Sequence, residues 1–286
     1  MTLVNMKELL TRADEAGVGC GAFNVGNMEM VMGVVKAAEE LDTPVIMQIA
    51  EGRLPYSPLA LIGPTMVAAA KQAKVDIAVH LDHGRSLQTI QQALDLGFTS
   101  VMYDGSSMPY RGNVRKTQEV VAVAKKYGAA VECEIGVVGG SEGGDYEHKI
   151  KYTDPQDAMQ FSRATGADAM AVAIGNAHGV YATEPQLRFD ILKRIHEKSA
   201  LPLVLHGGSG ITDEDFQEAI RCGIRKVNIA TASFMNATAF AQEYLLRTHS
   251  SGSGEKPNYF GLSDAMVQGT YENVKHHIKV FTFRDK

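Results

Sequence analysis

The segment HLDHG, residues 80–84, places a carboxylate between two imidazoles at the end of an apolar run. His178 and His206 follow apolar runs later in the chain, as His83 does here. Three imidazoles would bind a metal ion such as zinc and leave its fourth position vacant, which suits a catalytic Lewis acid. The alternative is that each histidine only hydrogen-bonds a loop, and it weakens if the fold brings all three together.

Regularly spaced strands could bring such distant residues to one point. Short apolar, β-branched runs predict eight strands, at 20–25, 44–49, 76–82, 100–105, 129–136, 169–175, 202–209 and 226–231. Most gaps between them carry apolar residues at helical spacing, as in 28–41 and 86–97. Strands that alternate with helices indicate right-handed βαβ units and a parallel sheet.

Eight such units favour an α/β fold closed into a single (β/α)8 TIM barrel. The alternative is an open, doubly wound sheet. We expect one barrel domain over residues 1–286, with an amino-terminal helix and a carboxyl-terminal helical tail from about residue 255 to 286.

In such barrels the chemistry lies at the carboxyl ends of the strands. Polar side chains gather at those ends, while the strand starts carry no comparable group of polar residues. The residues concerned are Asn24, Gln48, Asp82, His83, Asp104, Glu134, His178, His206 and Asn228. This asymmetry is the main functional signal in the sequence.

The remaining histidines are weaker candidates for metal ligands. His80 shares strand parity with Asp82, so we expect it to point into the barrel below the rim, in a packed or supporting role. The others are expected to be solvated in loops or on helix faces: His148, His196, His249, His276 and His277.

The composition narrows the class of protein. The net charge of −5 gives no electrostatic case for a nucleic-acid or membrane-surface partner. No apolar stretch approaches the ~18 residues of a membrane span, and the amino terminus reads as an amphipathic helix rather than a signal peptide. Cys20, Cys133 and Cys222 are odd in number and lack CxxC spacing, which favours reduced, packed thiols in a cytoplasmic protein.

Five segments, HLDHG, EIGVVGGSE, AIGNAHGVY, LVLHGGSG and KVNIAT, together resemble the motif series of the class II, zinc-dependent ketose-phosphate aldolases. That family includes fructose- and tagatose-bisphosphate aldolases, and the resemblance runs from about residue 20 to residue 231. It implies that His83, His178 and His206 are zinc ligands. It also implies that Asp104 and Glu134 support these ligands or form an alternative ligand set.

The resemblance further assigns the proton transfers. It implies that Asp82 exchanges the proton on the C4 oxygen, whereas the residue types alone also allow a structural aspartate that orients a ligand histidine. Glu142 falls after the Gly-Gly pair in the glycine-rich loop 136–148, where the family's acidic residue moves the proton at carbon. Taken alone, this segment reads as a plain surface loop.

Two glycine-rich strand ends, HGGSG and NIAT, fit a phosphate cradle because backbone amides there can approach an anion closely. The resemblance implies that this cradle binds dihydroxyacetone phosphate, with a monovalent cation (Na⁺ or K⁺) nearby, and that the enzyme is a homodimer or homotetramer. The implied substrate contacts are Asn24, Gly179, Gly207, Gly208, Ser209, Asn228, Ile229, Ala230 and Thr231.

One departure from the family bears on the substrate. Where these bisphosphate aldolases carry an arginine for the second phosphate, in a DPR segment, this chain reads KPNYF, with Asn258. Loss of a guanidinium weakens recognition of a second phosphate. We therefore expect a ketose 1-phosphate or sugar-acid phosphate, unless Arg53, Arg85 or Arg111 contacts a distal phosphate or carboxylate.

The sequence also allows three other functions. They are a fructose- or tagatose-bisphosphate aldolase, a different metal-dependent barrel enzyme such as an epimerase or hydrolase, and a non-catalytic sugar-phosphate-binding barrel. A Schiff-base aldolase is disfavoured, because the strand AMAVAIG has no lysine and Lys226 opens its strand at the end away from the rim.

Overall fold

The computed structural model describes residues 2–140, 150–179, 185–250 and 256–284. Eight parallel strands form a closed barrel in the order β1-β10-β9-β7-β5-β4-β3-β2. Their bounds are β1 Cys20–Asn24, β2 Val45–Ala50, β3 Ile77–Gly84, β4 Ser100–Tyr103, β5 Ala130–Ile135, β7 Ala169–Val172, β9 Leu203–Leu205 and β10 Ile224–Ile229. The pairing of β1 with β10, which begins at Cys20 and Lys226, closes the sheet and excludes the open alternative. The predicted TIM barrel is confirmed.

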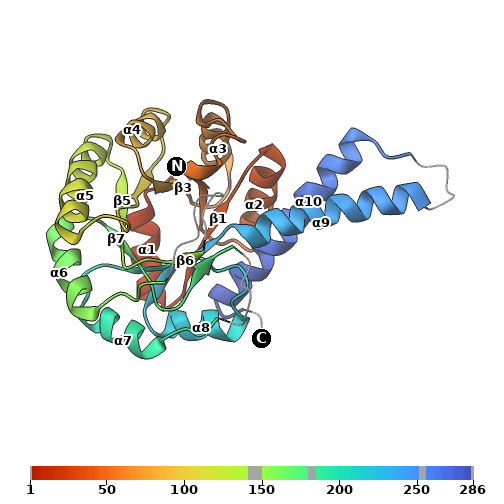
Figure 1. Ribbon diagram of the computed structural model, residues 1–286. Helices are drawn as coiled ribbons and strands as arrows, with labels where there is room; N and C mark the ends of the chain where they lie inside the picture. The colour runs from red at the N-terminus through yellow and green to blue at the C-terminus, as the bar shows by residue number, and fades with distance from the viewer. Residues whose placement is uncertain (1, 141–149, 180–184, 251–255, 285–286) are drawn as a thin grey trace.

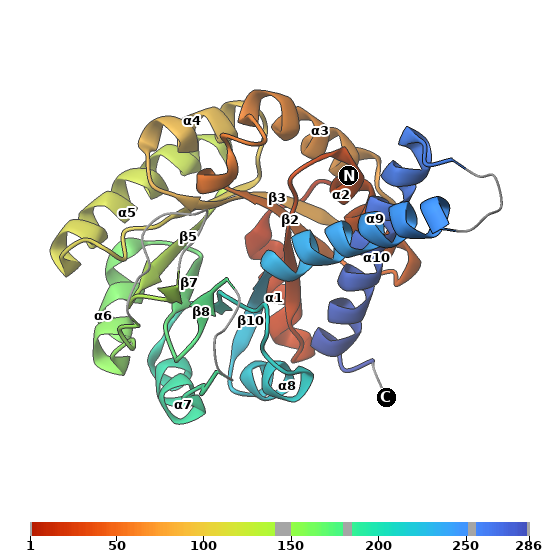
Figure 2. The same ribbon diagram turned by 45° about the vertical axis from the view of Figure 1, so that its right-hand side comes forward.

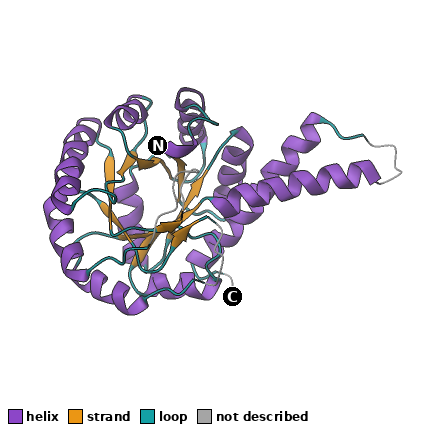
Figure 3. Cartoon of the chain, viewed as in Figure 1, coloured by secondary structure: helices purple, strands orange, loops and turns teal. Residues whose placement is uncertain are grey.

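Helices surround this barrel (Figures 1 and 3). They are α1 Met6–Ala16, α2 Met28–Glu40, α3 Leu59–Gln72, α4 Leu87–Asp95, α5 Tyr110–Ala124, α6 Pro155–Thr165, α7 Phe189–Lys198, α8 Asp213–Arg221, α9 Thr231–Ser250 and α10 Tyr259–Phe281. Several begin at a polar side chain that accepts a hydrogen bond from a first-turn amide, as Ser86 does for α4 and Thr212 for α8. Gly128 and Gly166 adopt the left-handed conformation just after helical segments and end them, as glycine does at many helix ends.

Helix α1 closes the amino-terminal end of the barrel. Its buried Met6, Leu9 and Leu10 pack against small and aliphatic side chains of the lower barrel interior. Those side chains belong to Ala22, Ile46, Ala78, Ala130, Ala169, Ala171 and Val204. Because this end is filled, a site reached from solvent is expected at the carboxyl end.

Helices α9 and α10 lie side by side and extend away from the barrel (Figures 1 and 2). The other end of α10 is anchored on α2, where Glu40 accepts hydrogen bonds from Tyr271 and Lys275. No described helix is long and apolar enough to cross a lipid bilayer.

The expectation that His277 is solvated was wrong. His277 is buried on α10 between Phe216 and Phe281, with ring centroids 5.8 and 5.6 Å away, and Nδ1 lies 2.7 Å from the carbonyl oxygen of Asn273. Burial lowers the pKa of His277 to about 4. The imidazole is on the apolar face of α10, because it lies seven residues after Thr270 and one turn before Phe281.

Candidate metal centre and active site

Three imidazoles meet at the carboxyl end of the barrel. His83 ends β3, His206 directly follows β9, and His178 comes from the short strand β8, Ala177–His178. Their ring centroids are 4.8 Å apart for His83 and His178, 4.6 Å for His83 and His206, and 5.8 Å for His178 and His206. One nitrogen from each ring lies within 4.8 Å of the other two, a spacing that one metal ion could bridge.

The backbone is unusual at His83. Its φ is +45°, in the left-handed region that non-glycine residues rarely adopt, and the pairing of β3 with β4 shifts register between Leu81 and Gly84. This local irregularity turns the imidazole so that Nδ1 lies 3.0 Å from Oδ2 of Asp104 and Nε2 lies 2.9 Å from Nδ1 of His206. Backbone strain at a candidate ligand is the pattern expected where a fold holds a functional group in place.

Two carboxylates adjoin the histidines. His83, Asp104 and Glu134 form a second group whose candidate ligand atoms lie within 4.8 Å of one another. Burial and the nearby Asp104 raise the pKa of Glu134 well above its ordinary value, and Glu134 Oε2 is buried without a hydrogen-bond donor from the described residues. Burial is the largest single effect and opposes ionisation of Asp104, but the hydrogen bonds from His83 and Ser106 and the charge of His83 together outweigh it and lower the Asp104 pKa.

These observations fit a cation. An unpaired carboxylate oxygen buried 3.8 Å from His206 Nδ1 is a group that a bound metal ion would satisfy. Burial, followed by repulsion from His83, lowers the pKa of His178 and of His206 well below the ordinary value. Both rings are therefore neutral near pH 7 and have the lone pairs that metal ligands need.

A buried glutamate inside the barrel holds His206 in one tautomer. Its Nε2 lies 2.7 Å from Oε1 of Glu132 on β5, so Nε2 carries the proton and Nδ1 is left to face His83. Oε2 of Glu132 lies 2.8 Å from Nζ of Lys226, and both side chains are fully buried. His80 lies in the same interior layer, as expected, with Nδ1 3.0 Å from Ser100 Oγ.

This buried ion pair was not predicted from the sequence. Lys226 does pair with the first residue of β1, in the lower half of the barrel, but it is the third residue of β10, not the first. Its side chain runs inside the barrel, where Nζ donates to Asn228 Oδ1 at 2.7 Å. The sequence did contain a signal. Lys226 is a charged residue at a position of an apolar strand whose side chain points into the barrel, and Glu132 and Glu134 hold such positions on β5.

Asp82, beside His83, is held by amides. Oδ2 accepts from Asn24 Nδ2 at 2.9 Å, and Oδ1 accepts from Asn228 Nδ2 at 3.1 Å. Gln48 Nε2 in turn donates to Asn24 Oδ1 at 2.7 Å, which fixes the orientation of that amide. Burial is the largest single effect and would raise the pKa of Asp82, but His83, His206, Lys226 and the hydrogen bond from Asn24 together outweigh it and lower the pKa. Asp82 is thus an oriented carboxylate at the edge of the histidine cluster.

The two glycine-rich segments lie next to each other. Gly208 N donates to Asn228 O at 3.3 Å, and Ser209 Oγ accepts from Ala232 N at 2.9 Å in the first turn of α9. A Cβ at Gly207, whose φ is +65°, would lie 2.1 Å from Ala177 O, so this close approach requires glycine. The predicted contacts that follow β9 and β10 are therefore together at the amino end of α9, a favourable position for a phosphate.

The other predicted substrate contacts differ in position. Asn24 supports Asp82 from β1, and Gly179, with a φ of +89°, directly follows the candidate ligand His178. Glu142 lies outside the described residues, as does His148. The short strand β6, Gly139–Gly140, pairs Gly140 with His178 and brings the chain before residue 141 against the histidine cluster.

A family model described as class-II fructose-bisphosphate aldolase matches residues 4–286. The chain belongs to this family. This confirms the resemblance seen in the five sequence motifs, and the protein is accordingly a lyase of the aldolase type.

Relatives and solved structures agree with the assignment. This aldolase is 39% identical to the fructose-bisphosphate aldolase of Geobacillus stearothermophilus over 250 residues, covering 86% of this chain and 87% of that protein. It is 37% identical to that of Staphylococcus aureus over 284 residues, covering 98% of both chains. The YdjI aldolase of Escherichia coli K12 superposes with a TM-score of 0.86 at 35% identity, covering 98% of this chain and 97% of the other.

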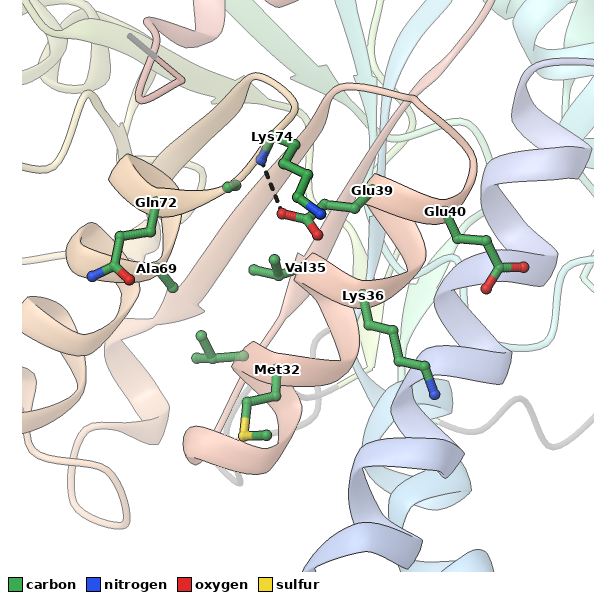
Figure 4. Close-up of a pocket in the computed structure, with 10 residues that line it drawn as sticks. Met32, Val35, Lys36, Glu39, Glu40, Ala69, Gln72 and Lys74 are labelled. Atoms are coloured by element: carbon green, nitrogen blue, oxygen red, sulfur yellow. Dashed lines mark hydrogen bonds between the residues drawn. The ribbon is translucent and has the colours of Figure 1, made fainter.

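The class II aldolase family is generally metal-dependent, and the aldolase offers the histidine cluster and its carboxylates as a candidate metal site. A second concavity lies on the outside of the barrel, between α2 and α3 (Figure 4). There the Lys74 amide donates to Glu39 Oε1 at 2.9 Å, and none of the candidate site residues lines the groove. The candidate site residues therefore lie at the barrel mouth and not in this groove.

Proposed function

We propose that this chain is a zinc-dependent aldolase that reversibly cleaves a ketose phosphate to dihydroxyacetone phosphate and an aldehyde. The observation that carries the proposal is the convergence of His83, His178 and His206 beside an oriented Asp82 at the barrel mouth. Three imidazoles with an adjacent open rim favour zinc in a catalytic rather than a structural site. When bound, zinc would supply the positive charge that stabilises an oxygen becoming anionic.

The protein's own residues would handle protons and the phosphate. Asp82, ionised and fixed by two amides, is proposed to take the proton from the C4 hydroxyl in cleavage and return it in condensation. Glu142 is proposed to move the proton at carbon. Backbone amides of the segments around Gly207 and Thr231, at the start of α9, are proposed to bind the phosphate, and a monovalent cation beside it stays a prediction.

We propose a ketose 1-phosphate or sugar-acid phosphate as substrate, rather than a bisphosphate. The position expected for an arginine that binds a second phosphate holds Asn258, whose Oδ1 caps α10 by accepting from Gly261 N at 3.0 Å. A neutral capping side chain supplies no charge to a dianion. The names of the curated relatives favour the second candidate, a fructose- or tagatose-bisphosphate aldolase.

A substrate screen tests both parts of the proposal. Chelator-treated and zinc-reloaded protein would be given ketose 1-phosphates, sugar-acid phosphates and the two bisphosphates, with coupled detection of dihydroxyacetone phosphate. We expect turnover only after reloading, and faster turnover of the monophosphates. Markedly faster cleavage of a bisphosphate would overturn the substrate proposal. A non-catalytic binder would bind sugar phosphates without exchanging the α-proton of dihydroxyacetone phosphate.

We also propose a homodimer or homotetramer in the cytoplasm. The far end of the α9–α10 pair exposes large apolar side chains, with exposed fractions of 60% for Leu246, 71% for Tyr259 and 76% for Phe260. An exposed apolar patch on a projecting element favours self-association. The three cysteines are unpaired and buried, in keeping with a reducing compartment. Light scattering after gel filtration tests the assembly, and a strictly monomeric mass would contradict it.

A further inference from the structure

A pocket beside the candidate catalytic centre contains the guanidinium of Arg53, which forms no ion pair with a described residue. It is lined by residues that follow β1, β2 and β10, namely Gly26, Asn27, Met30, Arg53, Tyr56, Ser57, Phe234, Ala237 and Thr238, together with Met266 of α10. The Arg53 guanidinium lies over the ring of Phe234, 5.5 Å from its centroid. Arg53 Nε is buried, and no described residue accepts a hydrogen bond from it.

The carboxylates near Arg53 have other partners. Glu51, on the same turn, accepts hydrogen bonds from the backbone amides of Arg85 and Ser86 and from Thr89 Oγ1. Glu29, in the first turn of α2, accepts from Ser263 Oγ at 2.9 Å. Among the described residues, none forms an ion pair with Arg53. A buried guanidinium donor without an acceptor is the mark of a site made for an anion.

The backbone adds a second favourable element. Helix α2 starts in this pocket, where Asn27 caps it by accepting from Met30 N at 3.0 Å. The first-turn amides of a helix and its dipole favour negative charge. Tyr56 is 82% exposed at the pocket edge, so the pocket is reached from solvent.

Three walls of the pocket continue from residues of the candidate site. Gly26 follows two residues after Asn24, which binds Asp82. Ala50 is the strand partner of Asp82, and Arg53 lies three residues after Ala50. At most about 10 Å of backbone therefore separates Arg53 from Ala50. Phe234 belongs to the first turn of α9, which begins at Thr231 in the proposed phosphate cradle. The pocket therefore lies on the Asp82 side of the centre, where the aldehyde half of the proposed substrate would extend beyond C4.

We infer that Arg53 binds an anionic group at the far end of the aldehyde half of the substrate. This inference rests on the proposed aldolase function and narrows its substrate class. The planar fork of one guanidinium pairs bidentately with one carboxylate, and Arg53 is the one charged side chain among the described residues that line the pocket, which matches the single charge of a carboxylate rather than the double charge of a phosphate. The substrate is accordingly a ketose phosphate whose chain ends in a carboxylate, a sugar-acid phosphate.

The test compares three substrates of equal chain length: a neutral ketose 1-phosphate, the corresponding sugar-acid phosphate and the corresponding bisphosphate. For zinc-loaded wild-type protein we expect kcat/KM to be highest for the sugar acid. In Arg53→Gln, the ratio of kcat/KM for the acid to that for the neutral sugar should fall about 10- to 100-fold, the loss expected for charge-assisted hydrogen bonds. Arg53→Lys, which keeps the charge but not the fork, should fall between the two.

Arg111→Gln is the matched control, because Arg111 is another arginine near the rim and is exposed at the start of α5. It should leave the substrate ratio unchanged, and thermal melting would show that all variants fold. An unchanged ratio in Arg53→Gln, or a fall in Arg111→Gln instead, overturns the inference. A wild-type preference for the bisphosphate that depends on Arg53 would overturn the choice of carboxylate.

A separate measurement distinguishes this failure from failure of the proposed function. Exchange of the α-proton of dihydroxyacetone phosphate reports on the donor half alone. If wild-type protein shows no exchange, the aldolase proposal itself fails. If exchange is present and Arg53→Gln reduces it as much as it reduces sugar-acid cleavage, Arg53 binds the donor phosphate and the inference is wrong.

Discussion

Replacing Glu132 by Gln should weaken zinc binding and destabilise the barrel for two separable reasons. The carboxylate accepts a hydrogen bond from His206 Nε2 at 2.7 Å and pairs with Lys226 Nζ at 2.8 Å, with all three side chains fully buried. Loss of a carboxylate that supports a ligand histidine typically costs about 10- to 100-fold in metal affinity. Leaving Lys226 buried without its anion should cost about 3–5 kcal/mol of unfolding free energy.

A double variant separates these effects. In Glu132→Gln with Lys226→Met, the uncompensated charge is gone and a side chain of similar volume remains, so most of the lost stability should return. The zinc affinity should stay low, because the acceptor for His206 is still a neutral amide. Glu119→Gln is the control, since its partner Lys116 is 42% exposed and a surface pair contributes at most about 1 kcal/mol.

The measurements are zinc affinity by competition with a chromophoric chelator and unfolding free energy by urea denaturation. We expect the unfolding free energy and the zinc affinity to respond differently to the second substitution. If the double variant regained wild-type zinc affinity together with its stability, Glu132 would be only the counter-ion of Lys226. Its proposed action on the metal ligand would then be refuted.

Two further predictions concern the proton carrier and the buried imidazole. Asp82→Asn should lower kcat by about 10²- to 10⁴-fold, the usual contribution of a positioned acid–base group. The same variant should still bind zinc, and loss of zinc with the activity would assign Asp82 a structural role. His277, with its pKa lowered from 6.5 to about 4, binds its proton more weakly when folded, so its contribution to stability is complete above pH 6.5 and is lost as the pH falls toward 4. Urea denaturation of wild type and His277→Gln between pH 7 and pH 4 should show a pH-dependent difference of up to about 3 kcal/mol, and parallel curves would contradict the assignment.

The barrel could be predicted from the sequence because each strand is a short apolar run bounded by a helix or a turn. The pair β6–β8 could not, since Gly139–Gly140 and Ala177–His178 are too short and too polar to show a strand period. Their pairing depends on two distant loops meeting over the rim. The apolar face that buries His277 was visible in the sequence, at helical spacing around Val274 and Phe281. His277 was expected to be solvated because the polar character of histidine was given more weight than its position on the helix.

The candidate site was predictable in its residue types but not in its interior support. The ends of the parallel strands identified His83 and His206, because closure of a barrel brings all such ends to one rim. The contacts of Glu132 with His206 and Lys226 depend on the relative register of β5, β9 and β10, which a single sequence does not specify. The pocket around Arg53 likewise needs the fold, since its walls come from three separate strand ends.

The central claim is that His83, His178 and His206 hold one catalytic zinc ion. Titration of zinc into chelator-treated protein, with formation of dihydroxyacetone phosphate as the readout, tests it most directly. Turnover should rise in proportion to zinc and level off at one ion per chain. Full turnover by the chelator-treated protein before any zinc is added would contradict the claim.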